Sequence, residues 1–293
     1  MAWQEEANIF TIAIDRTSVN RPVDALTYRR AFSFTARMSD QPILAIQPLA
    51  LFVTDLDHTL VGDPVALKSL NTILTRLRQE QGLKIVYATG RSITSYQELA
   101  AAEQLLIPDA LVTSVGTEIY LDGEKTCAAW DEKLAVGWQR SEIVQIAKRF
   151  ADLGSQPQSE QRPYKISYYL SEEAAIEVIP RLRQELKKHD IIAEIIYSGH
   201  KDLDIIPKAS NKGAAVQFLR QFWSIPAQQT VVCGDSGNDI SLFSYDAEYG
   251  ILVGNSHTEL KLWYEINATE RHYLAHNNCS QGIAEGLDYF GFI

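Results

Sequence analysis

The sequence predicts an α/β protein: a doubly wound parallel sheet with a small α+β lobe inserted into it. From residue 49 the chain alternates short apolar runs with segments of helical periodicity. Such alternation with short connections is typical of right-handed crossovers in a parallel sheet. Between residues 117 and 206 the strands instead alternate polar with apolar side chains, and from residue 211 the first pattern resumes. This interruption predicts that the second lobe is an insertion, called the cap below.

The composition excludes several classes of protein. The chain has 293 residues, 46% of them hydrophobic and 22% charged, which is enough for two lobes of a globular protein. No apolar run approaches the roughly 18 residues of a membrane span. A net charge of −10 argues against a nucleic-acid surface, which needs a basic face. A phosphorylated substrate is still compatible, because a metal ion and a few cations can reverse the field inside a cleft. We expect a monomer without nucleic-acid or membrane partners.

The cysteines and the N-terminal segment bear on location. Cys127, Cys233 and Cys279 are scattered and form no C-x-x-C pair, which favours a reducing compartment, and we expect a cytoplasmic protein. Residues 1–47 lack a clear period, and their acidic start argues against a secretory signal. We interpret them as a flexible, dispensable extension, with translation from Met38 as an alternative.

Each element of the predicted core has its own signature. The apolar run at 49–53 predicts a strand buried on both faces. Residues 65–79 carry apolar side chains at helical spacing, and Gly82 is placed to cap that helix. Further strands are predicted at 84–88, 110–114, 230–233 and 251–254, with helices over 94–106, 211–223 and from about 239.

The inserted segment predicts an antiparallel sheet with two helices. Residues 117–121 followed by Asp122-Gly123 predict a hairpin. Ser171 is a good helix start, and Pro180 is expected to kink that helix or shift its first turn. The predicted elements are strands at 164–170, 191–197 and 203–206 and helices at 141–153 and 172–189. We assign 48–124 and 207–293 to the core and 125–206 to the cap.

Two acidic motifs follow predicted strands. Asp55 and Asp57 come directly after the first strand, where open α/β sheets bind ligands and where carboxylates suit a divalent cation. Asp is also common in turns, and the short motif alone does not decide between these interpretations. The run Gly234-Asp235-Ser236-Gly237-Asn238-Asp239 follows another strand, and its carboxylates four residues apart can face one metal. An ordinary loop is the alternative, but the two motifs together favour a metal site.

Two further motifs suit phosphate. Thr89-Gly90-Arg91 ends a predicted strand and opens a helix, where a hydroxyl and backbone N–H groups bind an anion. Lys212 begins another helix and supplies the charge that a transferring phosphoryl group requires if it points into the cleft. A surface position for Lys212 is the alternative.

The sequence resembles the haloacid dehalogenase superfamily of phosphotransferases, which has four motifs in a set order. The matching segments are, in that order, Asp55-Leu56-Asp57-His58-Thr59, Thr89, Lys212 and Gly234 to Asp239. The insertion resembles the cap of its C2 branch. More narrowly, several stretches resemble the sucrose-phosphate phosphatases of the cyanobacterial, single-module kind. They include Tyr87 to Ser92, Val115 to Tyr120, Lys165 to Tyr168 and Ser210 to Gly213. The resemblance starts near residue 49, and His58 departs from the Asn or Gly that the superfamily usually has there.

This resemblance implies a haloacid dehalogenase-like, Rossmannoid core that hydrolyses sucrose 6-phosphate to sucrose and phosphate, the final step of sucrose synthesis. Asp55 would be the nucleophile that forms an aspartyl-phosphate, and Asp57 the general acid and base. Mg²⁺ would be held by Asp55, the Asp57 carbonyl, Asp235 and Asp239.

The resemblance also implies how substrate is held. Thr89 and Lys212 would bind the phosphoryl oxygens, and Asn238 would orient Lys212 or a water. Specificity would come from polar residues at and below the cap. The candidates, with Thr89, Lys212 and Asn238, are Gly90, Arg91, Glu118, Lys165, Tyr168, Lys201 and Asp202. The alternative is that the cap residues are exposed positions of a half-solvated sheet.

Two other functions compete with this one. A phosphatase of the same superfamily for trehalose 6-phosphate or of the mannosyl-3-phosphoglycerate type would use the same core motifs. A non-catalytic module that binds sucrose-phosphate synthase, the candidate protein partner, would not need them. The intact Asp55, Asp57, Lys212 and Asp235 argue against a non-catalytic domain.

Overall fold

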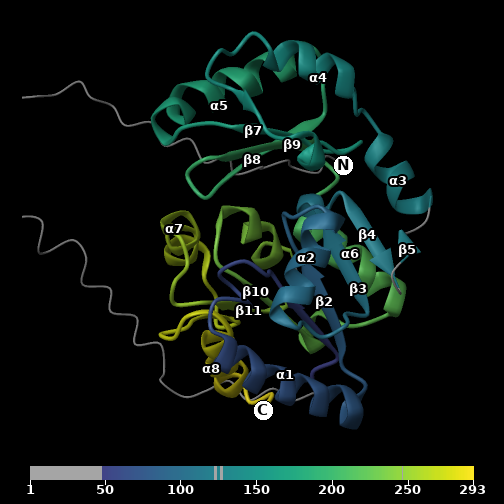
Figure 1. Ribbon diagram of the computed structural model, residues 1–293, viewed down its shortest axis with the longest axis vertical. Helices are drawn as coiled ribbons and strands as arrows, with labels where there is room; N and C mark the ends of the chain where they lie inside the picture. Colours follow the sequence, from purple (N-terminus) through teal and green to yellow (C-terminus); the bar gives the residue numbers. More distant parts are fainter. Residues whose placement is uncertain (1–47, 122–123, 126–127, 246) are drawn as a thin grey trace, which may run out of the picture. The chain divides into compact units, whose positions relative to one another are not determined.

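The computed structural model describes residues 48–121, 124–125, 128–245 and 247–293 (Figure 1). The predicted extension 1–47, the turn at Asp122-Gly123 and Cys127 lie outside the described residues. All described residues belong to one compact unit, which contains an eight-stranded and a four-stranded sheet. In this part of the chain no helix is long and apolar enough to cross a membrane.

The larger sheet confirms the predicted doubly wound core. Its parallel strands run in the order β12 (His272–Leu274), β11 (Tyr249–Leu252), β10 (Thr230–Gly234), β1 (Leu51–Thr54), β2 (Lys84–Ala88) and β3 (Ala110–Thr113). The hairpin of β4 (Glu118–Leu121) and β5 (Glu124–Lys125) extends it antiparallel. The strand order reverses at β1, which lies between β10 and β2. In such sheets ligands bind at the carboxyl ends of the strands beside this point.

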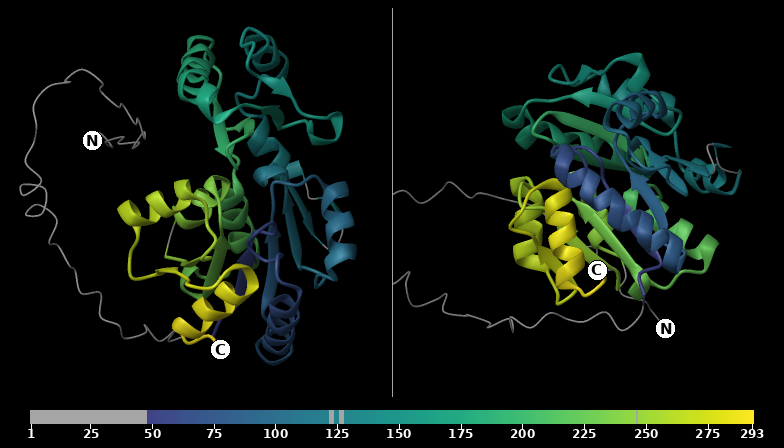
Figure 2. Two further views of the ribbon diagram at one scale, coloured as in Figure 1. Left: turned by 60° about the vertical axis from the view of Figure 1, so that its left-hand side comes forward. Right: turned by 60° about the horizontal axis from the view of Figure 1, so that its bottom comes forward.

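Helices cover both faces of the larger sheet (Figure 2). Helices α1 (Pro64–Gln81), α2 (Ile93–Glu103) and α8 (Cys279–Tyr289) pack on the face that carries Phe52 and Tyr87. Helices α3 (Ala128–Ala135), α6 (Lys212–Trp223) and α7 (Thr258–Asn267) pack on the face that carries Leu51 and Val53. Because successive strand residues point to opposite faces, a strand covered on both sides is largely apolar, and in β1 the first three residues are apolar and all four are buried.

The helix ends follow local sequence signals. The Asp63 carboxylate accepts hydrogen bonds from the first N–H groups of α1, and Gly82 ends this helix in the left-handed conformation, with φ 72°. The Asn211 side chain accepts the N–H of Ala214 at 2.7 Å and so caps α6. This cap fixes the start of α6 at Lys212.

The cap is a four-stranded antiparallel sheet with helices on one face, as Figure 1 shows. Its strands run in the order β6 (Gly154–Ser155), β7 (Ile166–Tyr169), β9 (Asp202–Pro207) and β8 (Ala193–Ser198). Helices α4 (Arg140–Ala147) and α5 (Glu172–Lys188) pack against one face of it, around Leu182 and Leu203. The opposite face of this sheet is left for other contacts.

Several details differ from the sequence predictions. The helix expected over 141–153 ends at Ala147, and the helix expected from residue 239 is a 3-10 helix, η4 (Gly237–Phe243). Helix α5 runs through Pro180 without ending, with Val178 and Leu182 on either side of it buried in the cap. Helix α3 lies in the sequence range predicted for the cap, yet its Trp130 packs on the larger sheet. The domain boundaries themselves stay a prediction.

Candidate active site

A cleft of about 600 Å³ lies where the carboxyl ends of β1, β2 and β10 face the free side of the cap sheet. Core residues form one wall, and cap residues form the other. The core wall includes Asp55, Asp57, Gly90, Arg91, Asp235 and Asn238, and the cap wall includes Gln156, Lys165, Tyr169, Lys201, Asp202 and Asp204. The structure therefore brings the acidic motifs, the Gly90-Arg91 turn and most of the predicted cap residues to one cavity.

Three buried carboxylates gather at the base of this cleft. Asp55, Asp235 and Asp239 each offer an oxygen, and these atoms lie within 4.8 Å of one another. Lys212 Nζ lies 2.6 Å from Asp55 Oδ1 and 2.7 Å from Asp239 Oδ1, and the Lys212 side chain has no exposed surface. If all four groups are ionised, the cluster carries a net charge of −2. Since uncompensated buried charge is costly, the cluster favours a further cation.

Burial and mutual repulsion govern ionisation in this cluster. Burial raises the pKa of Asp55, and the charge of Lys212 partly opposes this effect. Burial and the neighbouring Asp239 carboxylate raise the pKa of Asp235. Burial alone would lower the pKa of Lys212, but the Asp239 and Asp55 carboxylates raise it above its ordinary value. Lys212 is therefore a permanent cation in the site.

The Gly-Asp-x-Gly-Asn-Asp loop holds the carboxylates in place. Asp239 Oδ2 accepts the backbone N–H groups of Asp235 and Ser236, both at 3.0 Å. A Cβ at Gly234 would lie 2.5 Å from the Asp239 Cβ, so this close approach requires glycine. The hydroxyl of buried Thr59 donates to Asp235 Oδ1 at 3.0 Å. One oxygen of Asp239 is thus fixed by the loop and one oxygen of Asp235 by Thr59, and the other oxygen of Asp239 meets Lys212.

The donor set fits a hard divalent cation. Asp55, Asp235 and Asp239 offer only oxygen atoms, which Mg²⁺ prefers over nitrogen or sulfur. The Asp57 carboxylate is not part of this group of described residues. The Asp57 carboxylate pairs instead with the Arg91 guanidinium.

Two of the predicted phosphate-binding groups are organised by the turn after β2. The Thr89 hydroxyl accepts the N–H of Arg91 at 3.1 Å and is buried beneath the cleft. Arg91 reaches across to Asp57 and also donates to the Ser95 hydroxyl at 2.7 Å. The turn therefore presents Gly90 and Arg91 to the cavity, with Thr89 behind them.

Asn238 lies in the cleft wall with an open amide. Its Oδ1 atom is buried and has no hydrogen-bond partner among the residues that the structure describes. The role of orienting Lys212, expected as one possibility, is instead filled by Asp55 and Asp239. A buried polar atom without a partner favours a ligand or a water in the cleft.

Lys165 reaches from the cap to the turn after β2. Its ammonium lies 3.4 Å from Asp204, 3.7 Å from Glu160 and 3.5 Å from the carbonyl of Gly90. Lys201 and Asp202 also line the cleft, and Asp202 accepts a hydrogen bond from Gln156 at 3.0 Å. These three positions agree with the predicted substrate-binding face.

Two predicted substrate-binding residues do not lie in the cleft. Tyr168 points into the cap core because alternate residues of β7 face opposite sides, and its neighbour Tyr169 lines the cavity instead. Glu118 is 2% exposed and forms an ion pair with Arg162, whose Nε and Nη2 both donate to Glu118 Oε1, at 2.9 and 2.7 Å. Glu118 therefore joins the core hairpin to the cap and does not contact the cavity.

Sequence reasoning also missed residues that line the cleft. Tyr169 could have been found from the period of β7, since it lies two and four residues beyond Ser167 and Lys165. Asp204 follows the same alternation from Asp202 on β9. Gln156 and His257 carry no local signal, because they enter the site only through the packing of distant segments.

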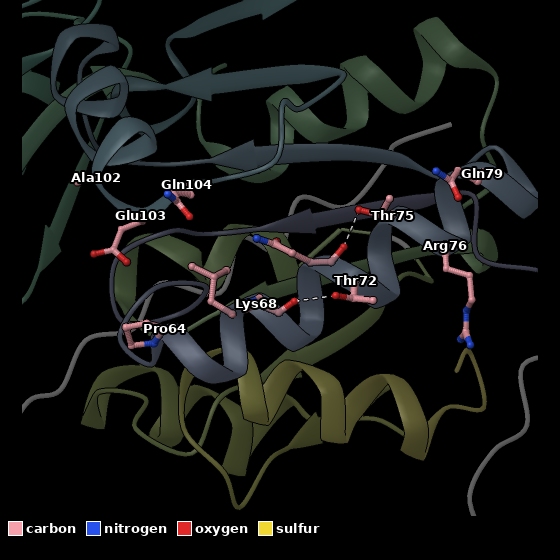
Figure 3. Close-up of a pocket in the computed structure, with 11 residues that line it drawn as sticks. Pro64, Lys68, Thr72, Thr75, Arg76, Gln79, Ala102, Glu103 and Gln104 are labelled. Atoms are coloured by element: carbon pink, nitrogen blue, oxygen red, sulfur yellow. Dashed lines mark hydrogen bonds between the residues drawn. The ribbon is translucent and has the colours of Figure 1, made fainter.

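A larger hollow, of about 930 Å³, lies between α1 and α2 (Figure 3). Figure 3 shows Lys68, Thr72, Thr75 and Arg76 along α1, with the hydroxyls of Thr72 and Thr75 donating to carbonyls of their own helix. The lining has no cluster of metal-ligating groups comparable to the carboxylates described above. The buried carboxylates therefore make the cleft under the cap the candidate active site.

Comparison with known proteins finds one family along most of the chain. Residues 48–291 match the family model described as sucrose-6F-phosphate phosphohydrolase. Probable sucrose-phosphatase 2 of Arabidopsis thaliana is 37% identical over 257 residues, which are 84% of this chain and 61% of the relative. The chain thus spans about three fifths of the length of the plant relatives that it matches. Mannosylfructose-phosphate phosphatase of Agrobacterium fabrum is 32% identical over 84% of this chain and 98% of its own.

A solved structure supports the same relationship. The chain is similar to the crystal structure of the sucrose-phosphatase from Synechocystis sp. PCC6803 in complex with sucrose and phosphate. The identity is 40% and the TM-score 0.80, and the match covers 84% of this chain and all of the other. This likeness covers both the core and the cap.

Proposed function

The chain belongs to the sucrose-6F-phosphate phosphohydrolase family, and we propose that it hydrolyses sucrose 6-phosphate to sucrose and phosphate. One observation carries the proposal: a buried carboxylate, Asp55, lies against a buried ammonium, Lys212, at the base of a polar cleft. A phosphoryl group needs such positive charge, and a polyhydroxylated sugar needs the donors and acceptors of the cap wall. The similar Synechocystis protein was crystallised with sucrose and phosphate, which supports this choice of substrate.

In the first step Asp55 attacks phosphorus. A bond forms between an Asp55 carboxylate oxygen and phosphorus, the bond from phosphorus to the sugar oxygen breaks, and Asp57 gives its proton to that oxygen. Lys212 stays beside Asp55 and stabilises the negative charge on the phosphoryl oxygens. Since Arg91 binds the Asp57 carboxylate, this ion pair has to open before Asp57 can carry the proton.

In the second step a water attacks the aspartyl-phosphate. Asp57 takes a proton from this water, the new bond from oxygen to phosphorus forms, and the bond to Asp55 breaks. Inorganic phosphate leaves, and Asp55 returns to its carboxylate form. Asn238 and the turn at Gly90 hold the phosphoryl oxygens during both steps of the reaction, and Thr89 supports this turn.

We propose Mg²⁺ as the cofactor. Asp55, Asp235 and Asp239, with the carbonyl of Asp57, would hold it, since these buried oxygens fit a hard cation. When bound, Mg²⁺ supplies positive charge that offsets the carboxylates and stabilises the transferring phosphoryl group.

The cap wall selects the sugar. Lys165, Lys201 and Asp202 offer donors and an acceptor for hydroxyl groups, and Tyr169 offers an aromatic face. Tyr169 is 47% exposed. Its ring is therefore accessible to a sugar that enters the cleft. Tyr168 and Glu118 are not part of this surface.

A second sugar phosphate has support from the relatives. The Agrobacterium fabrum protein, which this chain matches over nearly the relative's whole length, is a mannosylfructose-phosphate phosphatase. Like sucrose, its substrate has a fructose unit. A panel of sucrose 6-phosphate, mannosylfructose phosphate and trehalose 6-phosphate separates the candidates, and a clear preference for either of the last two would exclude the sucrose proposal.

The decisive experiment is phosphate release from sucrose 6-phosphate with Mg²⁺. We expect rapid release by the wild type and a loss of at least about 10³-fold in Asp55→Asn, which lacks the nucleophile. Asp152→Asn changes an exposed carboxylate of the cap in the same way and should keep full activity. Activity retained by Asp55→Asn would exclude the proposed chemistry.

Two further parts of the proposal concern the cell. Sucrose-phosphate synthase is the candidate protein partner. If the purified protein bound the synthase tightly but released no phosphate from sucrose 6-phosphate, the non-catalytic alternative would be favoured. The thiols of Cys233 and Cys279 are free, which supports a reducing, cytoplasmic location. Fractionation of the source cells tests that location.

A further inference from the structure

A second group of metal-ligating side chains lies at the edge of the cleft. His200, His257 and Glu259 each offer one ligand atom, and these atoms lie within 4.8 Å of one another. His200 is in the turn between β8 and β9 of the cap, whereas His257 caps α7 of the core and Glu259 lies in its first turn. The group therefore joins the two lobes.

Two of the three ligands, His200 and Glu259, have partners that fix their side chains. His200 Nδ1 lies 3.1 Å from the Glu172 carboxylate, and its Nε2 lies 4.0 Å from Glu259 Oε2. Glu259 Oε1 accepts the N–H of Gly237 at 3.4 Å. A carboxylate on the far nitrogen of a histidine fixes the ring and its tautomer, and this arrangement typically accompanies metal-binding histidines.

The third ligand is held through its backbone. The N–H of His257 donates to the carbonyl of Asp235 at 2.7 Å, which anchors this residue to the loop of the acidic motif. His257 Nε2 lies 3.7 Å from Asp235 Oδ2. The rings of His200 and His257 lie 5.8 Å apart between centroids, close enough for nitrogens of both to reach one ion.

We propose that His200, His257 and Glu259 bind a zinc ion. Two imidazoles and one carboxylate are a well-known donor set for zinc, with a fourth position open to water. The same donors suit Mg²⁺ poorly, because this hard cation prefers oxygen and loses its waters reluctantly. The nearby carboxylates Asp55, Asp235 and Asp239 offer oxygen alone, so the two groups select different metals.

Zinc at this position links cap and core beside the substrate. Ser198, Gly199 and His257 line the cleft, and His200 directly follows Gly199. A metal bridge between the lobes restricts the movement that admits substrate and releases product. Zinc therefore acts as an inhibitor of turnover that does not displace Mg²⁺.

Zinc titration by calorimetry in excess Mg²⁺ tests the site without relying on activity. We expect the wild type to bind about one equivalent and His200→Ala to bind at least about tenfold more weakly. Glu172→Gln keeps all three ligands, loses the carboxylate that orients His200, and should show an intermediate affinity. His276→Ala is the matched control: His276 also pairs with a carboxylate, Glu285, at 2.9 Å, but it lies outside the group and its loss should leave zinc binding unchanged.

One further variant, Asp55→Asn, separates this site from the Mg²⁺ ligands. Asp55→Asn should still bind one equivalent of zinc. With Co²⁺ in place of zinc, Asp55→Asn should show a visible absorption band that is absent from His200→Ala. Zinc should slow phosphate release by the wild type several-fold more than by His200→Ala. Equal zinc affinity in the wild type and His200→Ala, with melting temperatures that show both are folded, would overturn the proposal.

Discussion

Arg91 holds Asp57 in a bidentate ion pair, with Nε to Oδ2 and Nη2 to Oδ1 both at 2.7 Å. The same guanidinium donates to the hydroxyl and carbonyl of Ser95 at the start of α2, so its position is set by the turn after β2. The Asp57 side chain is 40% exposed to the cleft. Arg91 thus positions the group that exchanges protons in the proposed reaction.

Arg91→Gln should lower kcat/KM by about tenfold or more. The variant removes both donors to the Asp57 carboxylate, which then loses the fixed orientation in which it takes a proton from water in the second step. Steady-state kinetics with sucrose 6-phosphate measure the effect. Arg76→Gln, an exposed position on α1, is the control and should behave as the wild type does. An unchanged kcat/KM in Arg91→Gln would show that the ion pair has no part in positioning Asp57.

Lys212→Met should destabilise the protein by about 3–5 kcal/mol without Mg²⁺. The change leaves the buried Asp55 and Asp239 carboxylates without their ammonium partner. Mg²⁺ should restore part of this loss, since it supplies charge to the same carboxylates. Urea denaturation of both proteins with and without Mg²⁺ gives the comparison. If Mg²⁺ stabilised the wild type but not the variant, Lys212 would be needed to form the metal site.

Mg²⁺ affinity should rise from about pH 6 to about pH 8. In the metal-free protein the pKa values of Asp55 and Asp235 lie above the ordinary carboxyl range, mainly because both groups are buried. Protons therefore compete with the metal at pH values where exposed carboxyls are already ionised, and binding releases them. Calorimetry in buffers of different ionisation enthalpy measures this release. A pH-independent affinity over this range would mean that both carboxylates are already ionised.

Arg162→Ala should lower the free energy of unfolding by about 2 kcal/mol. The substitution leaves Glu118, which is 2% exposed, with only hydroxyl partners in the core hairpin. Arg181→Ala is the matched control, because Arg181 forms an exposed pair with Glu177 on α5 that contributes little. Urea denaturation of the two variants tests the difference. Equal stability of both would show that the Glu118–Arg162 contact does not hold the cap to the core.

Much of the core was predictable because its signals are local. Apolar runs that end in Asp55, Thr89 or Gly234 mark strand ends, and the carboxyl ends of parallel strands meet at one edge of a sheet. The sequence alone therefore predicted that Asp55, Asp235, Asp239, the turn after Thr89 and the lysine at the start of α6 come together at one end of the sheet. The caps Gly82 and Ser171 were predictable for the same reason, since they act on neighbouring residues.

The tertiary structure decided everything that depends on how distant segments face each other. Alternation along β7 places Tyr168 and Tyr169 on opposite faces, but which of them faces the cleft follows from the side of the cap sheet that α4 and α5 cover. Glu118 forms its ion pair with Arg162, 44 residues away, because the cap packs against the hairpin of β4 and β5. His200 and Glu259, far apart in sequence, meet only where the cap touches α7. Such contacts carry no local signal, because packing between lobes, and not chain neighbours, sets their geometry.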